Sequence, residues 1–105
     1  MPTTKIKNSV PVELGGKTRH LRFSFNALVA LEDELGIPIS EIGDVLSGSV
    51  KLRDLRSLIW AGLLHEDKTL STEDVGEWLD FSILEVVAGK LRDAFEAAFP
   101  VEEKK

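Results

Sequence analysis

His20 and His65 are the histidines of this sequence, and they are its first candidates for metal binding or general-base catalysis. A metal site built on them needs further ligands at fixed spacing, such as His-Glu-x-x-His or pairs of cysteines. His65 is followed by Glu66 and Asp67, without a second histidine, and the chain has no cysteine. We therefore expect no metal site. We interpret His65 as an imidazole at the carboxyl end of a helix, interacting with the last carbonyl groups.

Other residue patterns that carry chemistry are also missing from the sequence. The glycine clusters Gly15-Gly16 and Ser47-Gly48-Ser49 do not have the spacing of phosphate-binding loops, and there is no Gly-x-Ser-x-Gly for a serine nucleophile. The paired carboxylates Glu73-Asp74 and Glu102-Glu103 fall where a helix start and a solvated tail favour negative charge. We therefore expect a protein that is not an enzyme and needs no cofactor.

Length and charge indicate one soluble domain that avoids nucleic acid. The chain has 105 residues, of which 43% are hydrophobic and 30% charged, as in ordinary globular domains. Residues 1–22 carry a net charge of +4, so the remaining 83 residues carry −9 of the total of −5, which opposes phosphate backbones. No signal peptide or membrane span is recognisable. We expect a single cytoplasmic domain over residues 1–105.

The amino-terminal part of the chain has the alternating pattern of a β-hairpin. After a flexible segment 1–9, apolar residues alternate on both sides of Gly15-Gly16, whose positive φ angles favour a tight turn. The hairpin is predicted over residues 10–25, with His20, Arg22 and Ser24 pointing outward. Its apolar positions are Val10, Val12, Leu14, Leu21, Phe23 and Phe25.

From Asn26 the apolar period changes to that of helices, and the helical body is predicted over residues 26–99. Expected helices run from Asn26 to Gly36, from the cap Ser40, from Ser49 or Val50 through Leu64, over 72–80 and over 83–99, followed by a tail 100–105. Ser71 with Asp74, and Ser82 with Glu85, have capping-box spacing, and Phe81 with Val86 has that of a hydrophobic staple. The predicted fold is α+β and mainly α-helical, with a β-hairpin packed on about five helices.

The third helix becomes apolar on every side, so it is the expected centre of the core. The residues assigned to the core are Phe23, Phe25, Leu28, Leu31, Leu58, Ile59 and Leu63. A small domain with two Trp and five Phe leaves some apolar surface, which marks a site for partner helices or self-association. The residues predicted to contact a partner are Trp60, Leu64, Trp78, Phe95 and Phe99. Burial of all five within the core is the alternative interpretation.

The two helices after Ser71 allow one alternative function, a small helix-turn-helix DNA-binding regulator. A recognition helix presents basic or amide side chains at its start. Here the second helix opens with Ile83-Leu84-Glu85-Val86-Val87. These residues favour protein contacts over base contacts.

Three segments, covering about two-thirds of the chain, resemble the tail assembly chaperones of long-tailed phages and gene transfer agents. Leu21–Gly36 contains Phe-x-Phe-Asn-Ala-Leu, Leu55–Asp67 contains Trp-Ala-Gly-Leu-x-His-Glu-Asp, and Leu70–Asp80 is similar to the helix that follows in that family. The resemblance does not extend to residues 83–105. It implies a non-enzymatic assembly factor that coats the tape measure protein, keeps it from aggregating and helps recruit tail tube subunits.

Overall fold

An antiparallel β-hairpin opens the fold, in a computed structural model that describes residues 9–47 and 50–98. Strands β1 (Val10–Leu14) and β2 (Lys17–Leu21) pair with Val12 opposite Arg19. Gly15 and Gly16 have φ angles of 62° and 82°, as the two central positions of a type I′ turn require. The predicted hairpin and its turn are confirmed, but the second strand ends at Leu21 instead of Phe25.

Helix α1 (Phe25–Leu35) begins earlier than predicted because Ser24 caps it. The Ser24 hydroxyl accepts a hydrogen bond from the Ala27 backbone N–H at 3.1 Å, so Ser24 is an N-cap and not a strand residue. The change of period at this cap turns Phe25 away from the core, and its exposed fraction is 81%. The assignment of Phe25 to the core is therefore wrong.

Helices α2 (Ile39–Ser47) and α3 (Leu52–Leu63) also differ from prediction at their starts. The Ile39 N–H at the start of α2 donates to the Glu32 carboxylate of α1 at 2.6 Å, so α2 begins before the predicted cap Ser40. Helix α3 begins after Lys51, which caps it without a side-chain hydrogen bond. A start at Ser49 or Val50 is thus wrong, and Leu52 in the first turn is 57% exposed.

Helices α4 (Thr72–Trp78) and α5 (Leu84–Ala98) complete the fold. The predicted capping box of Ser71 and Asp74 is present in both directions, at 3.1 Å each. Ser82 instead lies before the N-cap position of α5, and its hydroxyl donates to Asp80. The predicted end of the last helix at residue 99, the tail 100–105 and residues 1–8 lie outside the described residues.

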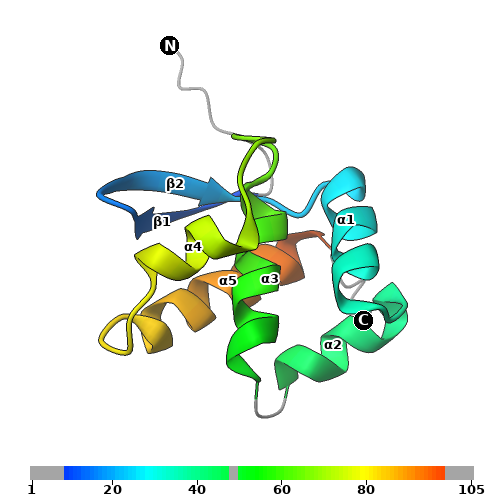
Figure 1. Cartoon of the computed structure of the whole chain (residues 1–105). Coiled ribbons are helices and arrows are strands. Elements are labelled where there is room, and N and C mark those ends of the chain that lie inside the picture. The colour runs from blue at the N-terminus through cyan, green and yellow to red at the C-terminus, as the bar shows by residue number, and fades with distance from the viewer. Residues whose placement is uncertain (1–8, 48–49, 99–105) are drawn as a thin grey trace.

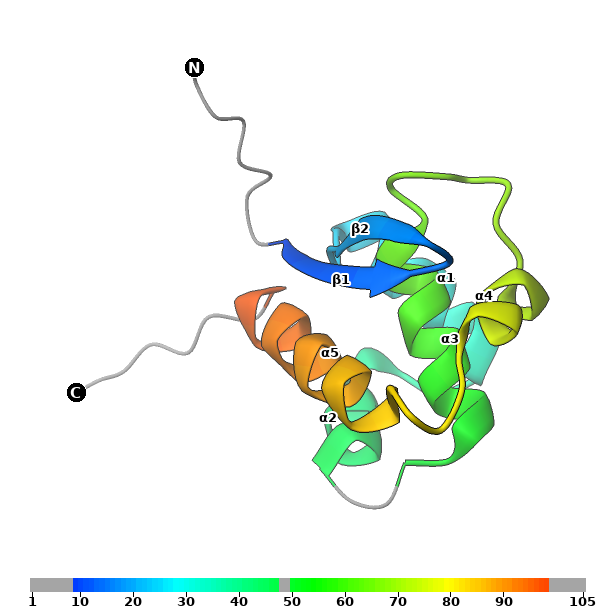
Figure 2. The ribbon, with the colours of Figure 1, turned by 90° about the vertical axis from the view of Figure 1, so that its left-hand side faces the viewer.

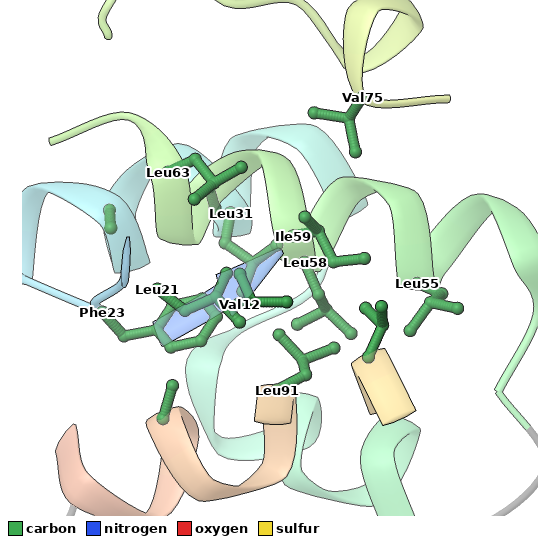
Figure 3. Packing of buried hydrophobic residues seen from close by; sticks show 14 of the residues in the cluster. Val12, Leu21, Phe23, Leu31, Leu55, Leu58, Ile59, Leu63, Val75 and Leu91 are labelled. Atoms are coloured by element: carbon green, nitrogen blue, oxygen red, sulfur yellow. The ribbon is translucent and has the colours of Figure 1, made fainter. Parts of the chain in front are cut away.

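Helix α3 is the centre of the structure, as its all-round apolar sequence predicts. Figure 1 shows α1 on one side of α3 and α4 on the other, and Figure 2 shows α5 beneath the hairpin. Figure 3 shows side chains from the hairpin, α1, α4 and α5 converging on α3. The fold is α+β and mainly helical. Of the residues assigned to the core, those found buried are Phe23, Leu31, Leu58, Ile59 and Leu63, and Leu28 packs partly buried against them.

The hairpin lies directly against α3 because Gly62 has no side chain. A Cβ atom at Gly62 would lie 2.9 Å from Cδ2 of Leu21 and 3.3 Å from Cζ of Phe23. At the same place the Arg22 N–H donates to the Gly62 carbonyl at 2.9 Å, which satisfies a carbonyl group in the last turn of the helix. Gly62 therefore lets a strand-to-helix connection reach the backbone of α3.

We expect Gly62→Ala to lower the free energy of unfolding by about 1 to 3 kcal/mol, because the added methyl overpacks the contact with Leu21 and Phe23. Gly89→Ala in α5 is the matched control: a Cβ there meets nothing within 4 Å, so the better helix propensity of alanine should stabilise the protein by up to about 1 kcal/mol. Urea denaturation of both variants measures this. Equal stability of the two variants would contradict the close contact.

We expect Leu63→Ala to lower the free energy of unfolding by about 2 to 5 kcal/mol, because Leu63 is 1% exposed. Phe25→Ala should change it by less than about 0.5 kcal/mol, since the ring is already in solvent. The same denaturation experiment compares them. A large loss on truncating Phe25 would mean that its ring is buried after all.

Candidate partner-binding groove

His65 and the following Glu66 hold the outer edge of strand β2. The His65 Nε2 donates to the His20 carbonyl at 2.6 Å, while the Glu66 carboxylate accepts from the His20 backbone N–H at 3.3 Å and lies 2.9 Å from the His20 ring Nδ1. Within the described ranges, no three His, Cys, Asp or Glu side chains gather as metal ligands would. We had expected His65 to bond the last carbonyl groups of its own helix. It instead reaches across to the carbonyl of His20 in the hairpin.

The two tryptophans predicted as partner contacts are half-buried and bind within the fold. Trp60 donates its indole N–H to the Leu70 carbonyl at 2.8 Å and so ties α3 to the loop before α4. Trp78 lies under the hairpin turn, with the Arg19 guanidinium 3.8 Å from its ring centroid. A Cβ at Gly15 would lie 2.8 Å from the Trp78 ring. Trp60 therefore joins α3 to the loop before α4, and Trp78 joins α4 to the hairpin.

The remaining predicted contact residues lie elsewhere. Phe95 on α5 packs edge-to-face on Phe23, with ring centroids 5.4 Å apart, and Leu64 is half-buried after the end of α3. Phe99 falls outside the described residues. The four described residues are thus distributed over α3, α4 and α5, and the role of all five in partner binding stays a prediction.

The most exposed large apolar side chains are different ones, and two of them line one groove. Leu52 is 57% and Phe81 79% exposed. The groove has a volume of about 280 Å³ and lies between the first half of α3, the end of α4 and the start of α5. Its lining residues are Leu52, Arg53, Leu55, Arg56, Gly76, Leu79, Asp80, Phe81 and Leu84.

Phe81 is held outward by a tight turn between α4 and α5. The Asp80 carboxylate accepts hydrogen bonds from the Ser82 hydroxyl and from the Ser82 N–H, the latter at 2.8 Å, and the Ile83 N–H donates to the Asp80 carbonyl at 3.2 Å. This is the side-chain-to-backbone pattern of an Asx turn. The exposed ring therefore stands at the apex of a hydrogen-bonded turn.

Arginines give one wall of this groove a positive charge. Arg53 is exposed and Arg56 half-buried on α3, and a Cβ at Gly76 would lie 3.2 Å from Cδ of Arg56. The absence of a side chain at Gly76 thus lets the Arg56 stem lie against α4. The Nε of Arg56 is buried without a hydrogen-bond partner among the described residues.

Apolar surface continues past this groove around the start of α5. A second hollow, of about 330 Å³, lies beside the contact of β1 with α5 and is lined by Pro11, Val12, Glu13, Ile83, Val86, Val87 and Lys90. Val86 is 61% exposed. The staple predicted between Phe81 and Val86 thus leaves both side chains in solvent.

Sequence reasoning missed Leu52 and Phe81 for two reasons. Leu52 fits the apolar period of α3, and only the position of the helix start moves it to the rim. Asp80-Phe81-Ser82 carries an Asx-turn signal, an aspartate two residues before a backbone donor, which would have placed Phe81 at a turn apex.

We expect the pKa of the Asp80 carboxyl to lie below its usual value, because the Ser82 hydroxyl, then the Ser82 N–H, stabilise its charged form. The contribution of this turn to stability is therefore complete above the unfolded pKa of about 3.9 and is lost as the pH falls through the lower folded value. Ser82→Ala should raise the pKa of Asp80 towards its usual value. NMR titration of the carboxyl carbons measures this.

The internal control is Asp67, whose pKa is lowered in the same way by the hydroxyl and N–H of Thr69. Its titration should stay unchanged in Ser82→Ala. An unaltered Asp80 titration in that variant would show that the turn does not depend on the serine.

Comparison with known proteins shows the family to which this chain belongs. No helix in the described part of the chain is long and apolar enough to cross a membrane. Curated proteins and solved structures give no match. The family described as "Phage tail tube protein, GTA-gp10" matches residues 8–99, from just before β1 to just after α5. The chain therefore belongs to this family of tail proteins of phages and gene transfer agents.

Proposed function

We propose that this chain is a tail assembly chaperone: it binds the tape measure protein in the host cytoplasm, helps recruit tail tube subunits and performs no chemistry. The observation that carries the proposal is the open groove, where Leu52 and Phe81 stand in solvent on a chain of net charge −5. Membership of a tail protein family supports the setting.

The groove and the surface around it offer the two properties that a chaperone for an apolar, helix-rich client requires. Covering exposed side chains such as Leu52 and Phe81 removes apolar area from water, and full burial of a side chain of this size is worth about 1.5 to 3 kcal/mol. The negative charge of the remaining surface keeps the complex dispersed. A hydrogen-bonded turn that already presents Phe81 reduces the entropy lost on binding.

Two other functions remain as competitors. The family description names a tail tube protein, and a tube subunit assembles with copies of itself into rings. A DNA-binding regulator would use the start of α5, where Glu85 and Val86 are the exposed side chains. A carboxylate at this place repels phosphate, which disfavours the DNA-binding role.

The test is co-purification of this chain with the tape measure protein of the same phage or gene transfer agent, comparing wild type, Phe81→Ser and Phe25→Ser. Phe81 and Phe25 are similarly exposed, 79% and 81%, but Phe25 does not line the groove. We expect Phe81→Ser to weaken capture at least tenfold and Phe25→Ser to leave it near the wild-type level, because only Phe81 is covered by the client.

Unfolding curves of both variants keep folding separate from binding. No capture by the wild-type chain would sink the proposal. Rings or tubes formed by the purified chain alone would favour the tube subunit, and duplex DNA binding that weakens steeply with salt would favour the regulator.

A further inference from the structure

Arg56 in the wall of the groove has a buried donor, its Nε–H, that finds no partner among residues 9–47 and 50–98. Buried polar groups in folded proteins are nearly always hydrogen-bonded, so an exception calls for a cause. The rest of the Arg56 side chain is well positioned, since its stem lies against Gly76 of α4. Packing therefore holds the Arg56 side chain in the wall of the groove.

The charges around the groove favour an anion as the partner of the Arg56 guanidinium. Arg53 lines the same groove, so two guanidinium groups lie on one wall. Asp80, the carboxylate that the described chain places at this groove, already accepts two hydrogen bonds from Ser82. A carboxylate brought by a partner would pair with a guanidinium fork that has five donors and strong geometric preference.

The groove also favours a helix over an extended strand as its occupant. Helix α3 supplies one wall and the end of α4 with the α4–α5 turn supplies the other. Backbone groups within a helix are already hydrogen-bonded, so these walls offer no sheet edge to an incoming strand. A helix satisfies its own backbone and presents side chains at i, i+3 and i+4 to one groove.

We propose that the groove binds an amphipathic helix of the partner that carries an Asp or Glu within its apolar stripe, and that this carboxylate pairs with the guanidinium of Arg56. Apolar side chains of the same helix cover Leu52 and Phe81. Leu52 lies one turn before Arg56 on α3, so the carboxylate lies about one helical turn from the apolar residue that covers Leu52. The inference rests on the proposed function for the identity of the partner, the tape measure protein.

The experiment measures binding of overlapping synthetic peptides from the tape measure protein to the wild-type chain by fluorescence anisotropy. Peptides that bind should contain Asp or Glu flanked by apolar residues at helical spacing. Changing that residue to Asn or Gln in the best peptide should weaken binding about tenfold or more, since the pair is desolvated in the groove.

The same peptides are then measured against Arg56→Met and the control Arg92→Met, an exposed arginine of α5 outside the groove. Arg56→Met should lose the discrimination between the acidic peptide and its amide variant, whereas Arg92→Met should keep it. Removing an unpartnered buried donor should leave the free chain at least as stable as wild type, which urea denaturation checks.

The possible outcomes separately test the role of Arg56, the location of the partner and the proposed function. Peptides that bind the groove with equal affinity in acid and amide forms would overturn the role of Arg56 and leave the chaperone proposal standing. Loss of binding on Phe25→Ser but not Phe81→Ser would place the partner on another face and overturn this inference. No binding by any peptide would overturn this inference alone if the whole tape measure protein is still captured, and both proposals if it is not.

Discussion

The contact between the hairpin and α3 at Gly62 is the constraint on which the remaining structure depends. Leu21 and Phe23 occupy the space that a side chain at Gly62 would fill, and the Arg22 N–H bonds its carbonyl. This contact places the hairpin across the end of α3, so that β1 lies over α5 and Phe23 meets Phe95. The orientation of α5, and with it one end of the groove, follows from a position without a side chain.

The aromatic residues are divided between holding the fold together and facing solvent. Trp60 and Trp78 use their polar or π character inside the fold, one on a carbonyl group and the other under a guanidinium, as amphipathic rings at a protein boundary commonly do. Phe25 and Phe81 have no such partners and stand exposed at the start of a helix and at a turn. The packing of the hairpin and α4 therefore determines which aromatic rings remain exposed.

The groove combines opposite physical properties within a small area. Its apolar side chains favour association, while the negative charge of the whole chain favours dispersion. Arg53 and Arg56 make its wall locally positive, and Arg56 leaves a buried donor unsatisfied in the free chain. In the proposed complex, a carboxylate opposite these arginines adds selectivity to an otherwise general apolar attraction.

Local sequence patterns determined the turn at Gly15-Gly16, the capping box at Ser71, the burial of α3 and the hairpin-plus-helices class, because each depends on residues a few positions apart. The Ser24 cap of α1 is also local, and it turns Phe25 outward. Tertiary structure decided where α3 begins, which leaves Leu52 exposed, and it decided that His65 bonds His20 and that Arg56 meets Gly76. These pairs are far apart in sequence, and no periodicity encodes such contacts.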